Sequence, residues 1–249
     1  MLWQDIMRTV CGEYRALLGD DLLGVYVHGS IAFGCFHPQK SDIDFLAVVR
    51  RALTPKEKAH MIRLLLRLAP EAPEKGIEMS VVLADDCRIF THPTPYQLHY
   101  SIAHHAAYES DMPGTLARLT GCDPDLAAHF TVTRAVGIAL MGPAPQDMFA
   151  PVPREAYLDS IRCDVENAVS DVMENPVYIL LNLCRVLAYI RDGSVLSKAG
   201  GGEWGIAHLS SAHRPMLEKA LDAYRTGSAF AHDPDAMQAF AREMLGEIL

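Results

Sequence analysis

The sequence predicts two domains: an α+β domain with a mixed sheet and flanking helices, followed by an all-α helical bundle. Three observations support this prediction. Short runs of β-branched and aromatic residues alternate with helical patterns up to about residue 85, helical patterns dominate from residue 123, and a proline-rich stretch covers 142–153. We place the boundary so that the domains are 1–145 and 146–249, sizes that are ordinary for single domains.

The first half opens with a helix and continues with strands. Apolar residues at helical spacing predict a helix over 3–18, and compact apolar runs predict strands at 22–27, 44–49 and 77–83. Thr54 and Glu57 form a capping-box pattern with Pro55 at the first helical position, so a helix should follow to about residue 68. These elements alternate in the way typical of a sheet covered by helices.

The second half reads as helices with clear start and stop signals. We expect helices at 123–140, 154–173, 175–192, 211–226 and 233–248. Asn175-Pro176 and Asp233-Pro234 are cap-plus-proline starts, and Gly193 and Gly227 are typical of helix ends. The pattern therefore favours a small bundle.

Composition excludes several function classes. The net charge is −9, which argues against a nucleic-acid-binding protein. The apolar runs are far shorter than the ~18 residues of a membrane span. The six scattered cysteines contain no CxxC pair, and the first residues contain no secretory signal pattern. We expect a cytoplasmic protein that acts as a monomer, without nucleic-acid or membrane partners.

Two aspartates stand at the head of the second predicted strand. Asp42 and Asp44 are two residues apart, so both carboxylates project from one face of the strand. Two close anions repel each other unless a cation lies between them, and magnesium with its preference for oxygen ligands is the natural occupant. Asp-x-Asp by itself is also common at solvated strand ends, so the interpretation depends on its context.

That context is a turn directly after the first predicted strand. Gly29 and Ser30 follow the strand, and Gly34 keeps the next turn compact. A strand, a turn with exposed amides and a hydroxyl, and then a helix start can hold a phosphate. Asp42 begins the acidic pair twelve residues after Ser30. The combination of a phosphate-binding turn with an acidic pair suited to magnesium is more specific than either feature alone.

Gly29-Ser30, Gly34 and Ser41-Asp42-Ile43-Asp44 resemble the signature of the nucleotidyltransferase superfamily. The resemblance implies that 1–145 is a nucleotidyltransferase domain and that a third carboxylate stands on a neighbouring strand. Glu78, in the strand predicted at 77–83, has the right spacing and strand face.

The second half resembles the helical domain of the streptomycin/spectinomycin-type aminoglycoside adenylyltransferases. The similarity is carried by Pro151-Val152-Pro153, Asn175-Pro176-Val177-Tyr178, Leu181–Arg185 and Leu196-Ser197-Lys198 through Glu203-Trp204. It implies an antibiotic-resistance transferase that moves AMP from ATP to a hydroxyl of a small molecule, an aminoglycoside such as streptomycin or spectinomycin, and releases pyrophosphate. The domain 146–249 would contribute substrate and nucleotide binding.

The resemblance also implies residue roles. Ser30, with Gly29, would hold the triphosphate, and Asp42 and Asp44 would bind two magnesium ions and contact the nucleotide. Glu78 would be a metal ligand, contact the acceptor and take its proton. Arg185 and Lys198 would supply cationic nucleotide contacts, which suits a polyanionic triphosphate.

One stretch departs from the family pattern. Residues 97–105 lack the tryptophan with which the streptomycin enzymes pack on the drug, and contain His99, Tyr100 and His104, which we expect among the acceptor-binding residues with Glu78. Two alternatives therefore stay open: a nucleotidyltransferase acting on a non-antibiotic metabolite or a protein hydroxyl, and a non-catalytic nucleotide-binding regulator.

Overall fold

A computed structural model of the chain describes residues 2–249 and divides into two compact units, one ending at Pro153 and the other spanning Arg154–Leu249. The predicted fold class, an α+β unit followed by a helical unit, is confirmed. The division lies eight residues beyond the predicted boundary. Met148 and Phe149 explain the difference, because they are buried against the sheet of the first unit.

A five-stranded mixed sheet forms the centre of the first unit, with strand order β5-β3-β2-β1-β7. Its β2 and β3 pair in parallel, and its other neighbours pair antiparallel. The strands are β1 (Leu22–Val27), β2 (Ile43–Val49), β3 (Ile77–Leu83), β5 (Leu98–Tyr100) and β7 (Ile138–Met141). The three longer strands agree with the sequence patterns to within one residue.

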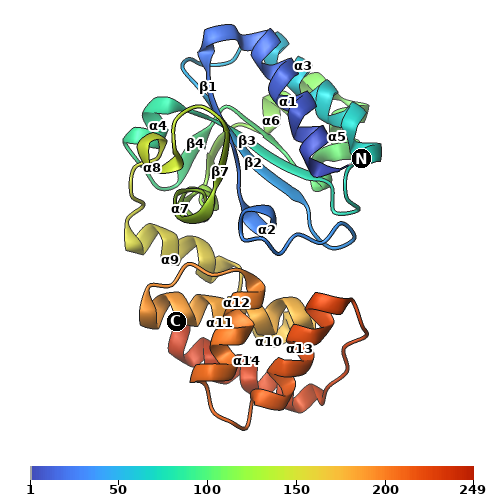
Figure 1. Ribbon diagram of the computed structural model, residues 1–249, viewed down its shortest axis with the longest axis vertical. Helices are drawn as coiled ribbons and strands as arrows, with labels where there is room; N and C mark the ends of the chain where they lie inside the picture. The colour runs from blue at the N-terminus through green and yellow to red at the C-terminus, as the bar shows by residue number, and fades with distance from the viewer. Residues whose placement is uncertain (1) are drawn as a thin grey trace. The chain divides into compact units, whose positions relative to one another are not determined.

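Helices cover both faces of this sheet (Figure 1). On one face α1 (Trp3–Leu18) and α3 (Pro55–Leu68) bury alternate strand residues such as Val25, Phe45 and Val81. On the other face α4 (Ala84–Arg88), α7 (Leu126–Val136) and α8 (Pro145–Met148) pack on Tyr26 and Leu46. Burial of both strand faces explains why these strands read as continuous apolar runs.

The helix predicted over 123–140 is correct in its middle but wrong in its last four residues. The helix α7 ends at Val136, and Ile138–Met141 continues as β7, which pairs with β1 at the sheet edge. Gly137 turns the chain from helical to extended backbone, with ψ at 148°. Helical spacing alone did not show that tertiary pairing would take over these residues.

Smaller elements complete the unit. A two-stranded ribbon pairs β4 (Thr94–Tyr96) with β6 (Gly121–Asp123). The short helices are α2 (Gly29–Ala32), α5 (His105–Ser110) and α6 (Met112–Arg118), and the 3₁₀ turns are η1 (Gly19–Asp21), η2 (Ala69–Glu71) and η3 (Ile102–His104). The apolar faces of α5 and α6 join the core on the α3 side through Tyr108 and Met112.

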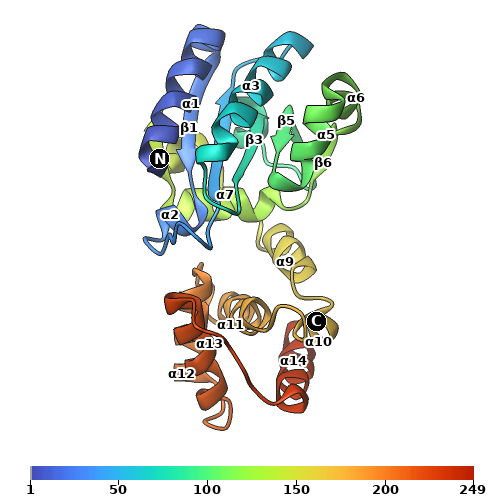
Figure 2. The same cartoon turned by 90° about the vertical axis from the view of Figure 1, so that its right-hand side faces the viewer.

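In the helical unit α11 is the central element, and α12, α13 and α14 pack against it or against each other (Figure 2). The helices are α9 (Arg154–Cys163), α10 (Ala168–Asp171), α11 (Pro176–Asp192), α12 (Lys198–His208), α13 (Arg214–Thr226) and α14 (Pro234–Ile248). The helix expected over 154–173 is two helices here. Among the described residues, no helix combines the length and the apolar character that crossing a membrane would require.

The helix α12 is the element of this unit that we did not expect. Its sequence contains Gly200, Gly201 and Gly202, which disfavour a helix by roughly 1 kcal/mol each. Close packing compensates: a Cβ built on Gly201 would lie 2.8 Å from the backbone nitrogen of Arg185 in α11. The glycines therefore let two helix backbones approach each other, and they fix where Lys198 and Arg185 stand.

Candidate active site

The turn between β1 and α2 brings the backbone close to the second strand. Gly29 has φ +58°, and a Cβ at this position would collide with the carboxylate of Asp44. The N–H of His28 donates to the carbonyl of Asp44 over 3.0 Å. Only glycine combines this backbone conformation with this close approach. The turn is thereby held beside the acidic pair.

Ser30 is the next residue in that turn. Its Oγ is buried and finds no hydrogen-bond partner among the described residues. A buried hydroxyl without a partner costs about 1–3 kcal/mol, so such a group is suited to hydrogen bonding with a polar ligand. The observation fits a triphosphate oxygen as that partner.

Three carboxylates converge next to this turn. Asp44 on β2 and Glu78 on β3 are direct partners in the parallel ladder, and Asp42 precedes β2 by one residue. One ligand atom from each of Asp42, Asp44 and Glu78 lies within 4.8 Å of the others. Three oxygen donors at this separation are the kind of set that holds Mg²⁺. The sheet register thus brings together the three acids that the sequence singled out.

Glu78 differs from an ordinary surface acid. Its side chain is 31% exposed, and burial raises its pKa, with the charges of Asp125 and Asp42 adding to the rise while His129 opposes it. A raised pKa makes a carboxylate a stronger base once it is ionised. This carboxyl group therefore has the electrostatic setting of a proton acceptor.

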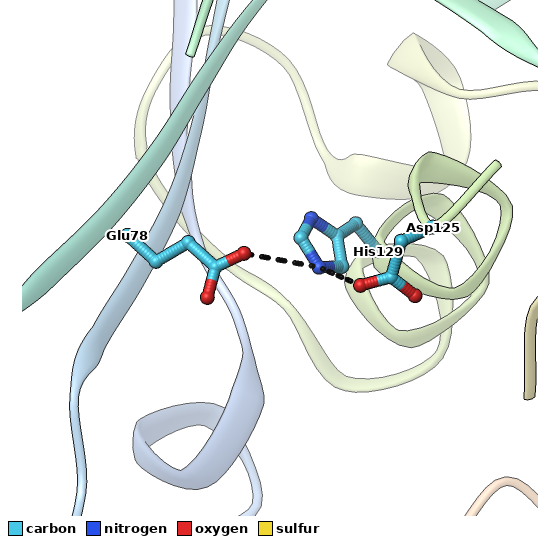
Figure 3. Close-up of side chains that lie close together, drawn as sticks. All are labelled: Glu78, Asp125 and His129. Carbon is cyan, nitrogen blue, oxygen red and sulfur yellow. Dashed lines mark ion pairs between the residues drawn. The ribbon is translucent and has the colours of Figure 1, made fainter. Parts of the chain in front are cut away.

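The sequence analysis did not identify two residues near Glu78: His129, which pairs with Glu78, and Asp125, which pairs with His129 (Figure 3). His129 on α7 places Nε2 3.7 Å from Glu78 Oε1 and 3.2 Å from Asp125 Oδ2. Burial alone would lower the pKa of His129, but the charge of Asp125, a hydrogen bond to it and the charge of Glu78 together raise that pKa to about 10. The spacing of Asp125 and His129, four residues apart on a helix, was the available signal.

Other groups extend this neighbourhood. The rings of His28 and His129 lie 4.7 Å apart, and burial together with the charge of His129 lowers the pKa of His28 well below its usual value. Glu78, Asp125 and His129 also form a second set of ligand atoms within 4.8 Å of one another. Within the described residues, Glu78 is thus shared between two possible cation-binding sets.

The residues predicted to bind the acceptor separate into two groups. His99 lies opposite Ser80 in the β3–β5 pair, and its Nδ1 is 2.9 Å from Ser80 Oγ. The ring of His104 lies 5.6 Å from that of His99. The prediction that Tyr100 binds the acceptor is wrong. Tyr100 is 1% exposed and points into the core on the opposite face of the sheet, where its hydroxyl hydrogen-bonds with Nδ1 of His105. Since strand neighbours alternate, Tyr100 cannot share a surface with His99.

Arg185 and Lys198 belong to the helical unit. Arg185 on α11 pairs with Asp164 over 3.3 Å, and its buried Nε has no partner within the described chain. Lys198 is the first residue of α12, and its Nζ lies 4.9 Å from the centre of the Tyr178 ring. Ser197 caps this helix by accepting from the N–H of Gly200. Both cations are therefore held by specific neighbours.

Known proteins resemble this chain at two levels: a family model matches the helical unit, and individual relatives match nearly the whole chain. Residues 147–247 match the family model described as the C-terminal domain of aminoglycoside adenylyltransferases. An Escherichia coli aminoglycoside (3'') (9) adenylyltransferase is 25% identical over 97% of this chain and 93% of its own length. An Enterococcus faecalis spectinomycin 9-adenylyltransferase is 22% identical over 84% of this chain and 82% of its own.

A solved structure has the same fold. The spectinomycin adenyltransferase AAD(9) from Enterococcus, crystallised with ATP and spectinomycin, superposes with a TM-score of 0.79 at 17% identity and covers 98% of both chains. The family model accounts for the helical unit, and the sequence relatives extend the match through the α+β unit. The resemblance expected from the sequence is therefore supported: the helical unit matches the C-terminal domain of the aminoglycoside adenylyltransferases, and nearly the whole chain is similar to members of that family.

Proposed function

We propose that this chain is a magnesium-dependent adenylyltransferase that transfers AMP from ATP to a hydroxyl of an aminoglycoside such as streptomycin or spectinomycin and releases pyrophosphate. The observation that carries the proposal is the convergence of Asp42, Asp44 and Glu78 beside the unpartnered hydroxyl of Ser30. Relatives named for this activity span nearly the whole chain, and the AAD(9) structure holds ATP and spectinomycin.

The acidic set suits hard cations. Asp42, Asp44 and Glu78 would hold Mg²⁺, with two ions as in other transferases of this mechanism. When bound, Mg²⁺ neutralises phosphate charge and lowers the barrier for displacement at the α-phosphorus. Without such cations, three carboxylates this close to a triphosphate would repel it.

The chain's own residues would orient the nucleotide. Gly29 and Ser30 supply a backbone turn and a hydroxyl for the triphosphate, and the hydroxyl would gain the hydrogen bond that it otherwise lacks. Arg185 and Lys198 would contribute positive charge from the helical unit. Arginine suits this role because its fork of N–H groups matches phosphate oxygens, and its buried Nε still lacks a partner among the described residues.

Glu78 would accept the proton of the acceptor hydroxyl. As that oxygen forms a bond to the α-phosphorus, the bond between the α- and β-phosphates breaks, pyrophosphate leaves with the electron pair, and the proton moves to a carboxylate oxygen of Glu78. The pKa of Glu78, raised by burial, increases the affinity of the carboxylate for this proton. His99 and His104 would contact the acceptor.

The position of the acceptor is the part of the proposal that distinguishes this chain from the streptomycin enzymes. Both tryptophans lie outside residues 97–105: Trp3 stands in α1, and Trp204 in α12 donates to Asp192. The rings of His99 and His104, whose centroids lie 5.6 Å apart, would pack on the acceptor in place of the drug-packing tryptophan of those enzymes. We propose a monomer that works in the cytoplasm, where its six cysteines remain free thiols.

The test is pyrophosphate release from ATP and Mg²⁺ with streptomycin, spectinomycin and a panel of other aminoglycosides. Mass spectrometry should find the acceptor heavier by one adenylyl group. Turnover with one of these drugs is expected. Bound ATP without pyrophosphate release from any of them would favour a nucleotide-binding regulator, and release with other metabolites would move the substrate outside antibiotics.

A further inference from the structure

The carboxylate of Glu78 lies between two groups of side chains. Asp42 and Asp44 approach it from the β2 side, and His129 with Asp125 approaches it from α7. We infer that His129 is a positioning residue: its imidazole holds Oε1 of Glu78, and Asp125 holds the imidazole. This inference rests on the proposed function and deepens it, because it names what keeps the proton acceptor in place.

Glu78 needs such a partner for electrostatic reasons. Its side chain has several rotatable bonds, and burial, together with the charges of Asp125 and Asp42, disfavours its ionised form. The imidazole of His129, 3.7 Å from Oε1, opposes this effect. The second oxygen of Glu78 points away from the imidazole (Figure 3). One oxygen is thus paired while the other stays available.

The imidazole itself is fixed by its surroundings. Asp125 lies one helical turn before His129 and approaches the same nitrogen, Nε2, within 3.2 Å. The ring of His28 packs on that of His129, with centroids 4.7 Å apart. The His129 side chain is only 14% exposed. Glu78, His129 and Asp125 therefore form a chain of contacts running from β3 to α7.

This chain of contacts is not what attaches α7 to the sheet. Leu126 and Phe130 bury the apolar face of α7 in the core with Tyr26 and Leu46. Because that packing is independent of His129, a polar or apolar replacement at 129 should leave the helix docked. The effect of losing His129 should instead fall on the Glu78 carboxylate.

The experiment compares His129→Leu and His129→Gln with a matched control, His213→Leu. His213, the residue directly before α13, is similarly shielded, with 17% side-chain exposure. It pairs with Glu243 over 3.1 Å, and its ring lies 4.9 Å from that of Phe240. Like His129, His213 is therefore a shielded histidine that pairs with a carboxylate and packs on another ring, but it belongs to the helical unit rather than the unit that carries Asp42, Asp44 and Glu78. Steady-state kinetics would give kcat and the KM values for ATP and for the drug that supports turnover.

We expect His129→Leu to lower kcat about 10- to 100-fold, the usual cost of removing a group that orients a functional side chain. Both KM values should change by less than about threefold, since binding contacts remain. His129→Gln should recover part of the loss, because the side-chain amide keeps a polar N–H group facing Glu78 Oε1. The control should stay within about twofold of the wild type.

The decisive comparison is made in the Glu78→Gln background. If His129 acts through Glu78, His129→Leu should cost nothing further there, whereas a general structural role would cost the same factor in both backgrounds. Equal losses in both backgrounds, or unchanged kcat in the single variant, would overturn the inference.

A second readout keeps the inference separate from the proposed function. Urea unfolding is measured for the wild type, Glu78→Gln, His129→Leu and the double variant that carries both changes. These four measurements give the coupling between Glu78 and His129 without any turnover. We expect a coupling of at least about threefold in the unfolding equilibrium constant. Absence of turnover with every acceptor would contradict the proposed function, and coupling below that level would contradict the pairing of Glu78 with His129.

Discussion

Asp44 on β2 and Glu78 on β3 lie directly opposite each other in the parallel strand pair at the centre of the sheet. Like charges in this relation are destabilising unless a cation compensates for them. The two strands are held in register by buried residues on both sides, so the backbones that carry the two acids stay adjacent. The core packing thus maintains a repulsive acidic site that is suited to bind a cation.

Replacing Glu78 by Gln should remove turnover without removing nucleotide binding. The amide cannot accept the acceptor's proton, so kcat should fall about 10²- to 10⁴-fold. Isothermal titration with a non-hydrolysable ATP analogue should give a dissociation constant within a few-fold of the wild type. Glu74→Gln, an exposed position four residues earlier, is the control. Full activity of Glu78→Gln would show that another group is the base.

Magnesium should stabilise the wild-type protein through the acidic set. At about 100 times its dissociation constant, a ligand that binds the folded state adds about 2.7 kcal/mol. The thermal midpoint should therefore rise with Mg²⁺ in the wild type but hardly in Asp42→Asn or Asp44→Asn. Asp20→Asn, whose side chain is 97% exposed, should respond like the wild type. An equal rise in all four proteins would place the ion elsewhere.

Ser30→Ala should weaken ATP binding while leaving the fold intact. The hydroxyl has no partner among the described residues, so its removal should not destabilise the protein. A hydrogen bond to a charged phosphate contributes about 1.5–3 kcal/mol, so affinity for ATP should fall roughly 10- to 100-fold. Ser211→Ala, at an exposed position, serves as the comparison. Unchanged affinity would exclude Ser30 from the phosphate site.

Two glycine-to-alanine changes should have opposite effects on stability. Gly201→Ala places a methyl group 2.8 Å from Arg185 and should cost about 1–3 kcal/mol by separating α12 from α11. Gly12→Ala in α1 meets open space and should stabilise by about 0.5–1 kcal/mol through helix propensity. Urea unfolding measures both. A neutral Gly201→Ala would contradict the close approach of the two helices.

Acid should destabilise the protein through His99. Burial lowers the pKa of this histidine to about 4, below the value of about 6.5 in an unfolded chain. The unfolded state therefore binds the proton first, and stability on the order of 2 kcal/mol should be lost as the pH falls from about 6.5 to 4. His99→Gln should reduce this loss in metal-free buffer. His60→Gln on α3, with 45% exposure, should keep the wild-type slope.

Local sequence was sufficient for features that depend on neighbouring residues. The capping box of Thr54 and Glu57 is present as expected, and the αL glycines Gly193 and Gly227 end their helices. The spacing of Asp42 and Asp44 put both acids on one strand face because side chains alternate along any strand. The motifs around Ser30 and Arg185 were also enough to indicate the family.

Tertiary structure decided what depends on distant residues. The parallel register set Glu78 against Asp44, the packing of α7 brought His129 to Glu78, and pairing with β1 made Ile138–Met141 a strand. Three glycines became helical in α12 because they let α12 approach α11. Tyr100 went to the core and His99 to the other face, since that choice depends on which face the β3 neighbour buries. Local propensities differ by about 1 kcal/mol per residue, and burying apolar surface across the sheet outweighs them.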